Sequence, residues 1–310
     1  MTSGRPLLSI VIPSFNQASF IREAIDSALL QEYRPIEVIV VDGASTDGTV
    51  DILETYRSRP EVRWTSEPDR GVVDAVNKGM ARARGDYLAI QSSDDLYLPG
   101  AFSRVMTEFE RDASLALVYG DVEYIDENGT IIGRTELPRF DLVDYVGKLT
   151  FIPQPAAFFS SSAARAAGPW REEVSYAADA EFYLRIAERF PVRKINAVLA
   201  RYRYHPAQRD KAGERIKRDW EAVVRPLLAS PDPRIRRSAR SGVELVKFHY
   251  TPEERWIRRT FHLYRAIAAN PALISRWEIR RERDLLPGQY PVRRLLSRIK
   301  RALGFRPRGT

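Results

Sequence analysis

The stretch GDYLAIQSSDDLYLP, residues 85 to 99, joins a short apolar run to an acidic turn. Residues 88 to 90 read Leu-Ala-Ile, a continuous apolar run of the kind that buried parallel strands show. Gln-Ser-Ser-Asp-Asp then ends the run, so that Asp94 and Asp95 closely follow the expected strand. In an open α/β sheet, ligands bind outside the carboxyl ends of the strands. The stretch therefore predicts a ligand-binding turn at that edge of a sheet.

Adjacent carboxylates in such a turn repel each other unless a cation or a hydrogen-bonded ligand offsets their charge. Their hard oxygen atoms favour Mg²⁺ or Mn²⁺. The alternative is a solvated turn that caps a helix expected to begin near Pro99. The segments that precede the turn favour the ligand site.

Strands and helices are expected to alternate along the N-terminal third of the chain. Runs of β-branched residues and leucine at 7–12, 36–41 and 62–65 predict three more buried strands. Apolar residues at helical spacing in 20–29 and 72–80 predict helices between the strands. A chain that alternates in this way builds an α/β fold with a parallel sheet.

A polar segment follows each expected strand. These segments are Pro-Ser-Phe-Asn at 13–16, Asp-Gly-Ala-Ser-Thr-Asp-Gly-Thr at 42–49, Glu-Pro-Asp-Arg-Gly at 67–71 with Asn-Lys-Gly at 77–79, and Ser-Asp-Asp at 93–95. In this order they resemble glycosyltransferase family 2, whose members are inverting sugar-nucleotide enzymes of the GT-A fold. The resemblance covers about residues 7–205.

The resemblance implies a fold and a division of the chain. Residues 1–206 would form a GT-A, Rossmann-like catalytic domain with a mixed, mostly parallel sheet flanked by helices. Residues 207–310 would form a helical, basic C-terminal region. The variant with Glu-Pro-Asp and Asn-Lys-Gly is similar to bacterial enzymes that build surface polysaccharide, lipopolysaccharide or related glycolipids.

The resemblance also implies how a sugar-nucleotide donor is bound. Asp42 would accept a hydrogen bond from N3–H of uracil or thymine, although an Asp before Gly is also a common turn starter. Asp94 would contact the ribose or the uridine side, and Asp95 would bind a divalent cation, Mg²⁺ or Mn²⁺, that bridges the two phosphates. Such a cation stabilises charge on the leaving diphosphate. The remaining donor-binding candidates are Pro13, Asn16, Arg70, Asn77 and His205.

The acceptor side of the resemblance centres on Asp179. In the family an acidic residue at this place, opening the same kind of helix, deprotonates the acceptor hydroxyl. An inverting displacement needs one such base, whereas a glycosidase uses two carboxylates that flank the bond. The family often has Glu-Asp where this chain has Ala178-Asp179. The alternative is that Asp179 only caps the helix, and Glu181 is the second candidate for the base.

Two further segments extend the acceptor half. Residues 115–119 and 122–125 read as two strands, and Glu-Asn-Gly-Thr at 127–130 reads as a hairpin turn. Together they are expected to shape the acceptor side.

Two more site candidates come from the resemblance. The segment 151–160 resembles the family's strand before the acceptor region, with Pro-Gln in place of the frequent His-Gln, which makes Gln154 a candidate. Residues 201–206 resemble the closing strand and loop, where a His or Arg reaches the donor diphosphate. His205 is the candidate there, although a lone His is more often structural.

Charge is distributed unevenly along the 310 residues, whose net charge is +8. Residues 201–310 hold 28 Lys or Arg and 11 Asp or Glu, a balance of +17, whereas residues 1–200 hold 21 and 30, a balance of −9. A basic block of this size suggests an anionic partner, either nucleic acid or a layer of phospholipid headgroups.

The C-terminal region is expected to be helical. Helices are expected at 214–228, 234–250 and 253–269, and apolar residues spaced among arginines predict a basic amphipathic helix at 292–303. That helix either binds an anionic membrane surface or packs as a solvated helix on its own domain.

The sequence has no cysteine, which excludes disulfides, a thiolate nucleophile and cysteine-ligated metals. No apolar run approaches the length of a membrane span, and the N-terminus lacks the pattern of a secretory signal. The expected location is cytoplasmic, with peripheral binding to the inner face of the membrane as an option.

Two functions from different classes compete. The first is an inverting glycosyltransferase that moves a sugar from a UDP- or dTDP-type donor to a hydroxyl of a lipid-linked or cell-surface glycan acceptor. The second is a non-catalytic nucleotide or nucleic-acid binder that uses the basic C-terminal region. A binder needs no base on the acceptor side, and nucleic-acid binding favours aromatic residues interleaved with basic ones. The sequence therefore favours the enzyme and predicts no nucleic-acid partner.

Overall fold

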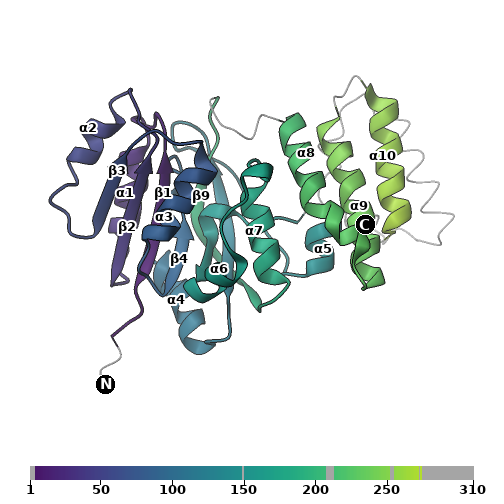
Figure 1. Cartoon of the computed structure of the whole chain (residues 1–310), viewed down its shortest axis with the longest axis horizontal. Helices are drawn as coiled ribbons and strands as arrows, with labels where there is room; N and C mark the ends of the chain where they lie inside the picture. Colours follow the sequence, from purple (N-terminus) through teal and green to yellow (C-terminus); the bar gives the residue numbers. More distant parts are fainter. Residues whose placement is uncertain (1–3, 149, 207–212, 252–254, 272, 274–310) are drawn as a thin grey trace, which may run out of the picture. The chain divides into compact units, whose positions relative to one another are not determined.

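The computed structural model describes residues 4–148, 150–206, 213–251, 255–271 and 273. The chain divides into two compact units (Figure 1). The first consists of Met1–Tyr145 and Thr150–Val223, and the second of Val146–Leu149 and Val224–Thr310. The structural division thus lies C-terminal to residue 206, where the sequence places the end of the catalytic domain, and that functional boundary stays a prediction.

A nine-stranded mixed sheet forms the centre of the first unit, in the order β3-β2-β1-β4-β8-β6-β9-β5, with β7 paired to β6. Strands β1 to β4 are parallel to one another, and β8 runs antiparallel to both β4 and β6. The strands are β1 (Leu8–Ser14), β2 (Ile36–Asp42), β3 (Val62–Ser66), β4 (Tyr87–Ile90), β5 (Leu96–Tyr97), β6 (Leu117–Ile125), β7 (Ile131–Arg134), β8 (Ala157–Ser160) and β9 (Val192–Arg203). The predicted fold class, a mixed α/β sheet flanked by helices, is confirmed.

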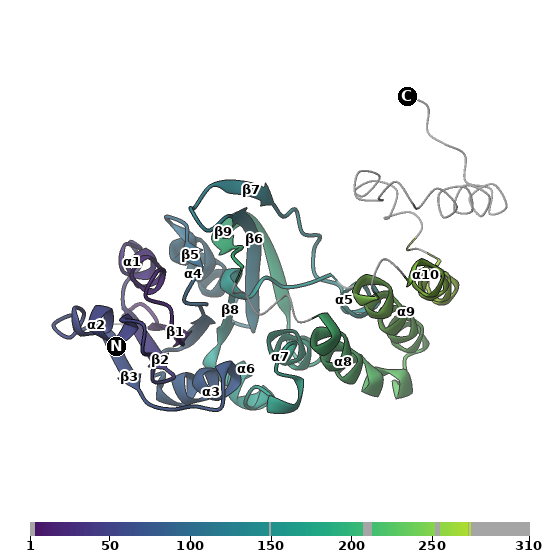
Figure 2. The same ribbon diagram turned by 90° about the horizontal axis from the view of Figure 1, so that it is seen from above.

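Helices cover both faces of this sheet. Figure 2 shows α1 and α4 on one face and α3, α6 and α7 on the other. The helices up to residue 224 are α1 (Ile21–Leu29), α2 (Thr49–Glu54), α3 (Val72–Arg82), α4 (Ala101–Arg111), α5 (Leu142–Gly147), α6 (Ser161–Ala167), α7 (Ala178–Ala187) and α8 (Gly213–Val224), with 3₁₀ turns η1 (Gln154–Ala156) and η2 (Glu172–Val174).

The strand order creates a switch point between β1 and β4. From β1 the chain moves outward to β2 and β3, and it then returns to place β4 on the other side of β1. The carboxyl ends of β1 and β4 are neighbours at this switch point, which is where open α/β sheets bind ligands. The acidic turn at 92–95 lies directly after β4, at the edge of the sheet where the sequence predicted it.

The predicted parallel strands are buried along their whole length. Every residue of β1 and β2 is buried, which explains why both read as unbroken apolar runs. Helix α3 packs closely on β1, since a Cβ at Gly79 would lie 2.2 Å from Cγ1 of Val11. The glycine of the Asn-Lys-Gly motif is thus required by close helix–sheet packing.

The two strands predicted at 115–119 and 122–125 are one strand, β6, which was wrongly divided at Asp121. The register of β6 against β9 shifts on both sides of Asp121, and the side chain is buried there. Its Oδ1 accepts hydrogen bonds from the Leu137 amide at 2.7 Å and the Thr135 hydroxyl at 3.1 Å, and its Oδ2 pairs with Lys194 at 2.8 Å. A fully partnered carboxylate can therefore stay inside a strand.

The hairpin turn predicted at 127–130 is confirmed, because β7 pairs antiparallel with β6 directly after it. The strand predicted at 151–160 is shorter than expected. Residues 154–156 form η1 and only Ala157–Ser160 is extended. Pro155 has no backbone N–H to donate, so a regular ladder begins only after it.

The second unit contains α9 (Pro233–Tyr250) and α10 (Trp256–Ala269), preceded by the 3₁₀ segment η4 (Arg225–Ala229). Asp232 caps α9 by accepting a hydrogen bond from the Arg234 amide, and Pro233 occupies the first helical position. Buried residues of the two helices and the segment that follows form a small apolar core, made of Leu245, Phe248, Leu263, Ala266 and Leu273.

These helices match two of the predicted ones, while the helix predicted at 214–228 becomes α8 followed by η4. The change occurs at Pro226, which cannot continue the α-helical hydrogen bonds. The basic amphipathic helix predicted at 292–303 lies outside the described residues. Within the described ranges no helix is both long and apolar enough to cross a membrane.

Candidate active site

A cavity of about 710 Å³ occupies the crevice at the carboxyl ends of β1 and β4. Its lining joins segments that are far apart in sequence: the loop after β1, the start of α3, the acidic turn, and the N-terminus of α7. Of the predicted site residues, those that line it are Pro13, Asp94, Asp95, Gln154, Asp179 and His205.

The acidic turn is tightly folded, since the Asp95 amide donates to the Ser92 carbonyl at 3.2 Å. Asp95 is only 1% exposed, and its Oδ1 accepts a hydrogen bond from the Arg203 amide at 2.8 Å. Its Oδ2 is buried and has no hydrogen-bond partner among the residues that the structure describes. Burial, together with the neighbouring charge of Asp94, raises the pKa of Asp95 well above its usual range.

Asp94 is the more accessible carboxylate of the pair. Its side chain is 14% exposed, and its Oδ2 lies 2.9 Å from Nε2 of His205. The imidazole in turn lies against the ring of Phe20, with the ring centroids 5.0 Å apart. A carboxylate and a histidine nitrogen therefore meet at the wall of the cavity.

The turn can take part in a divalent-cation site only together with a ligand. Among the residues that the structure describes, no group of three or more His, Asp and Glu side chains is placed to hold a metal ion. Mg²⁺ and Mn²⁺, however, are commonly bound by one or two carboxylates together with substrate phosphates. The Asp94 carboxylate and the unpartnered Oδ2 of Asp95 fit that pattern. The assignment of the metal to Asp95 stays a prediction, and Asp94 is the better placed of the two.

Arg203, which the sequence did not single out, holds the turn in place. The residue is 2% exposed, and its guanidinium donates to the Asp94 carbonyl at 2.9 Å and the Glu127 carbonyl at 3.1 Å. It also pairs with Glu23 at 2.7 Å. Strand β9 thereby fixes the acidic turn, α1 and the β6–β7 hairpin to one another.

Gln154 braces the same turn from the other side. Its amide nitrogen donates to the Ile90 carbonyl at 2.8 Å, and its oxygen lies 3.0 Å from the Ser92 hydroxyl. The residue therefore fixes the end of β4 as well as lining the cavity.

Asp42 does not face the cavity with a free carboxylate. The residue is fully buried, and its Oδ2 accepts hydrogen bonds from the Ser45 amide at 2.9 Å and the Ser66 hydroxyl at 2.7 Å. Its Oδ1 accepts from the Ser45 hydroxyl at 2.5 Å. These contacts show that Asp42 helps to hold the loop after β2, and its role in binding the donor base stays a prediction.

Asn16 and Asn77 likewise hold segments of the protein together. Asn16 has a backbone φ of 53°. Its side-chain oxygen accepts a hydrogen bond from the Thr46 amide at 3.0 Å, and its backbone amide donates to the Ser45 hydroxyl at 2.7 Å. Asn77 accepts from the Trp170 amide at 2.8 Å and donates to the Trp170 carbonyl at 2.9 Å. Each side chain keeps further hydrogen-bonding capacity, so a role of either residue in donor binding stays a prediction.

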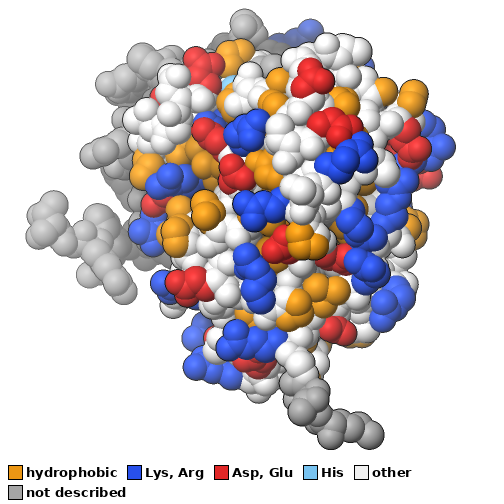
Figure 3. Space-filling view, turned by 90° about the vertical axis from the view of Figure 1, so that its left-hand side faces the viewer, with side chains coloured by type: hydrophobic (Ala, Val, Ile, Leu, Met, Phe, Trp, Pro, Cys, Tyr) orange, Lys and Arg blue, Asp and Glu red, His pale blue; other side chains and the backbone are white. Residues whose placement is uncertain are grey.

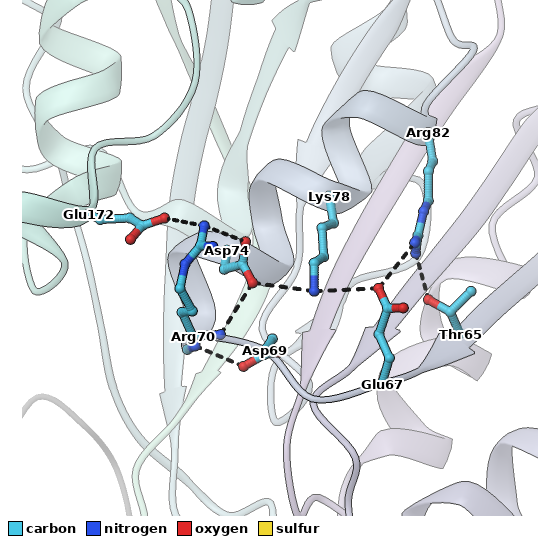
Figure 4. Close-up of polar contacts among 9 residues, drawn as sticks. Thr65, Glu67, Asp69, Arg70, Asp74, Lys78, Arg82 and Glu172 are labelled. Carbon is cyan, nitrogen blue, oxygen red and sulfur yellow. Dashed lines mark hydrogen bonds and ion pairs between the residues drawn. The ribbon is translucent and has the colours of Figure 1, made fainter.

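Arg70 belongs to a row of ion pairs along α3 (Figure 4). Its guanidinium contacts Asp74 at 3.1 Å and Glu172 at 2.7 Å. Lys78 continues the row, with contacts to Asp74 at 3.3 Å and to Glu67 at 3.4 Å. Backbone hydrogen bonding from Arg70, followed by the nearby cations, lowers the pKa of Asp74. Arg70 therefore bridges α3 and the loop before α7 and is turned toward protein carboxylates.

Asp179 lies in the first turn of α7 and lines the cavity beside Ala178. The N-cap residue is Ala177, and no side chain caps this helix, so the interpretation of Asp179 as the cap is wrong. Glu181 is buried and engaged, since both its oxygens accept from Arg185 and it pairs with Arg171 at 3.1 Å. Only Asp179 of the two acidic candidates opens onto the cavity.

The family model described as glycosyl transferase family 2 matches residues 9–165, about half of the chain. The chain belongs to glycosyl transferase family 2. The matched region includes β1 to β4, the acidic turn and β8, and the predicted family is therefore confirmed. The domain is a glycosyltransferase domain.

Among relatives of this family 2 domain, chondroitin synthase of Escherichia coli is 33% identical over 195 residues. The match covers 62% of this chain but only 28% of that synthase. An uncharacterised glycosyltransferase of Rickettsia typhi is 28% identical over 225 residues, which covers 70% of each chain.

Solved structures place the same domain in the GT-A fold. Staphylococcus aureus TarS 1–349, in complex with UDP-GlcNAc, superposes with a TM-score of 0.63 at 15% identity over 86% of this chain and 83% of that one. The mannosyltransferase PcManGT of Pyrobaculum calidifontis, in complex with GDP-Man and Mn²⁺, superposes with a TM-score of 0.61 at 18% identity over 98% and 82%. At these identities the likeness establishes the fold alone.

Proposed function

We propose that this chain is an inverting glycosyltransferase that moves a sugar from a nucleoside-diphosphate sugar of the UDP or dTDP type to an acceptor hydroxyl. One observation carries the proposal: a single cavity contains the acidic turn after β4 on one side and Asp179 on the other. A displacement at the anomeric carbon needs a group that stabilises the leaving diphosphate and a separate base for the acceptor. The cavity offers a candidate for each.

The donor would lie across the carboxyl ends of β1 and β4, with Pro13 beside it. This crevice is where open α/β sheets bind nucleotides. The complexes of TarS with UDP-GlcNAc and of PcManGT with GDP-Man and Mn²⁺ support a nucleotide-sugar donor and a divalent cation.

A divalent cation would neutralise the negative charge that develops on the diphosphate. In the proposal Asp94 provides the accessible carboxylate oxygen for it, with His205 beside that carboxylate. Asp95, the ligand that the sequence favoured, would take part through its unpartnered Oδ2. Arg203 and Gln154 hold the turn rigid, so the carboxylates need little rearrangement when the donor binds.

Asp179 would take the proton of the acceptor hydroxyl. The acceptor oxygen then forms a bond to the anomeric carbon while the bond from that carbon to the diphosphate oxygen breaks, and the electron pair leaves with the diphosphate. Attack from the face opposite the leaving group inverts the anomeric configuration. The engagement of Glu181 with two arginines leaves Asp179 as the base in this proposal.

The acceptor is proposed to be a lipid-linked or cell-surface glycan, met at the cytoplasmic face of the membrane. Two observations support this choice. The relative in Escherichia coli is a chondroitin synthase, and the C-terminal region carries the +17 balance expected of a segment that binds anionic lipid.

The face of the molecule that corresponds to the left-hand side of Figure 1 is not a favourable nucleic-acid surface. On the face shown in Figure 3, basic and acidic side chains are interspersed, with hydrophobic ones scattered among them. A nucleic-acid site requires a basic patch or stripe.

A binding screen tests the donor class. The full-length protein is titrated with UDP, dTDP, GDP and CDP and their common hexose conjugates, each with Mn²⁺ and with a chelator. We expect UDP- or dTDP-sugars to bind and to be turned over only with the cation. Failure of every nucleotide sugar to bind would refute the proposal.

A further inference from the structure

Helix α8 forms part of the active-site cavity, although the sequence placed the end of the catalytic domain at residue 206. Ile216 of α8 lines the cavity together with Asp179, and the helix belongs to the first structural unit, which extends to Val223. Figures 1 and 2 show α8 beside α7. The family model matches residues 9–165, so it does not describe this wall of the cavity.

Two contacts anchor α8 to the start of α7. Asp219 is only 1% exposed, and its Oδ2 accepts a hydrogen bond from the Tyr176 amide at 3.0 Å. The ring of Trp220 lies next to that of Tyr145, with the centroids 6.1 Å apart, and the Tyr145 hydroxyl donates to the Ala180 carbonyl at 3.1 Å. These contacts reach the chain on both sides of the candidate base, so they fix α8 against the acceptor part of the cavity.

Arg215 lies one turn before Asp219 on the same helix and contacts the rim of the cavity. Tyr176 lines the cavity and shortly precedes Asp179 in the sequence. Nη1 of Arg215 donates a hydrogen bond to the Tyr176 hydroxyl at 3.1 Å, and the guanidinium carbon lies 5.7 Å from the centre of the same ring. Arg215 is exposed to solvent. A cation is therefore held at the edge of the acceptor part of the cavity.

The charge of Arg215 is not offset within the described part of the chain. The other two cations of α8 pair with carboxylates of the same helix: Lys217 with Glu214, and Arg218 with Asp219. No carboxylate that the structure describes forms an ion pair with Arg215, whose guanidinium contacts a hydroxyl. A guanidinium presents five N–H donors in a fork that fits carboxylate and phosphate oxygens, and the hydroxyl contact uses only one of them.

The cavity itself is acidic. The Asp, Glu, Lys and Arg residues in its lining are all aspartates, namely Asp69, Asp94, Asp95 and Asp179. A negatively charged acceptor is repelled by such a site unless a cation on the acceptor side offsets the repulsion. A neutral acceptor gains nothing from an unpaired guanidinium at this place. The position of Arg215 therefore favours an acceptor that carries negative charge.

We propose that Arg215 binds a negatively charged group of the acceptor, either the carboxylate of an acidic sugar or a phosphate that links the acceptor to its carrier. This inference rests on the proposed function, since it presumes that an acceptor hydroxyl reaches Asp179. Carboxylate and phosphate share the chemistry that the guanidinium recognises, two or more oxygens that accept in one plane. The substrate class is an anionic glycan.

Sugar transfer to pairs of acceptors that differ only in charge tests the inference. One pair is an oligosaccharide that contains glucuronic acid and its carboxyl-reduced form. The other is a glycan on a polyprenyl diphosphate and the alkyl glycoside of the same glycan. We expect the wild-type protein to have a KM at least tenfold lower for the charged member of one pair, and that pair distinguishes carboxylate from phosphate.

Arg215→Gln should remove this preference. The KM for the charged acceptor should rise about ten- to hundredfold, the range for loss of a charge-assisted hydrogen bond, while the KM for the neutral acceptor changes little. UDP affinity and melting temperature should stay near the wild-type values, because Arg215 is exposed and lies outside the cavity lining. Arg215→Lys keeps the charge without the planar fork, so it should regain part of the preference.

Lys217→Gln is the matched control. It removes one positive charge from the same helix at a residue that pairs with Glu214, and it should keep the wild-type ratio of the two KM values. Equal loss of preference in Lys217→Gln and Arg215→Gln would show a general effect of charge and overturn the inference.

The remaining outcomes separate this inference from the proposed function. If the wild-type protein neither binds nor hydrolyses any nucleotide sugar, both fail. If it hydrolyses a nucleotide sugar but shows no preference for the charged member of either pair, or uses none of these acceptors, only this inference fails. Retention of the preference by Arg215→Gln places the recognition of the acceptor charge elsewhere and also overturns it.

Discussion

Asn77→Ala is predicted to destabilise the fold while leaving nucleotide affinity nearly unchanged. The Asn77 amide makes two hydrogen bonds to the backbone of Trp170, at 2.8 and 2.9 Å, across a sequence separation of 93 residues. Trp170 is only 6% exposed, so its amide will lose a partner that water cannot easily replace. The variant therefore removes a tie between α3 and the loop before η2.

The magnitude follows from these contacts. A hydrogen bond contributes about 0.5–1.5 kcal/mol, and a buried donor left without a partner costs about 1–3 kcal/mol. We expect the free energy of unfolding to fall by about 2 to 3 kcal/mol. For a unit of this size that corresponds to a drop in the melting temperature of roughly 5 to 10 °C.

The assay pairs calorimetric melting with titration by UDP. Asn196→Ala is the matched control, because Asn196 is exposed on β9 and its side-chain oxygen accepts a hydrogen bond from Lys194 at 3.0 Å, with no tie to a distant segment among the described residues. That variant should change the stability by less than about 0.5 kcal/mol. A large loss of UDP affinity in Asn77→Ala without a drop in melting temperature would refute the reasoning and restore Asn77 to the donor site.

Three further predictions concern the fold, the cation and the membrane. Gly79→Ala should lower the free energy of unfolding by about 1–3 kcal/mol, because the added methyl would meet Val11 at 2.2 Å; unchanged denaturant unfolding would contradict this. Asp94→Asn should remove cation-dependent donor binding in a Mn²⁺ titration, and Asp95→Asn should do so less completely; the reverse order would return the metal to Asp95. Deletion of residues 291–310 should release the protein from anionic vesicles in a sedimentation assay and leave UDP affinity intact, whereas equal sedimentation would exclude membrane binding by that segment.

The sequence was most informative where burial is complete. Strands β1 and β2 are buried on both faces, so their apolar runs are unbroken and their limits were predicted to within two residues. Strand β6 was wrongly divided because Asp121 is a buried polar residue whose partners, Thr135 and Lys194, come from other strands or loops. A local pattern contains no information about such partners.

The sequence predicted where in the fold the candidate site lies, but it did not predict which side chains are engaged in contacts within the protein. Asp94, Asp179 and His205 meet at one cavity because the loops that carry them gather there, and family motifs indicated those loops. Asp42 and Asn77 belong to the same motifs, yet their side chains are committed to backbone or hydroxyl groups of the protein. A polar residue that holds a loop and one that holds a ligand look alike in the sequence, because the distinguishing partner is distant along the chain.

The most direct test of the central claim measures sugar transfer by the wild-type protein and by Asp179→Asn. The donor is the tightest-binding nucleotide sugar, the acceptors are a panel of oligosaccharide and lipid-linked glycans, and proton NMR records the anomeric configuration of the product. We predict inversion, with turnover by Asp179→Asn reduced about 10²- to 10⁴-fold, as loss of a general base requires. UDP affinity and melting temperature should stay near the wild-type values, since no side chain caps α7. A product with retained configuration, or near-normal turnover by the Asn variant, would contradict the account.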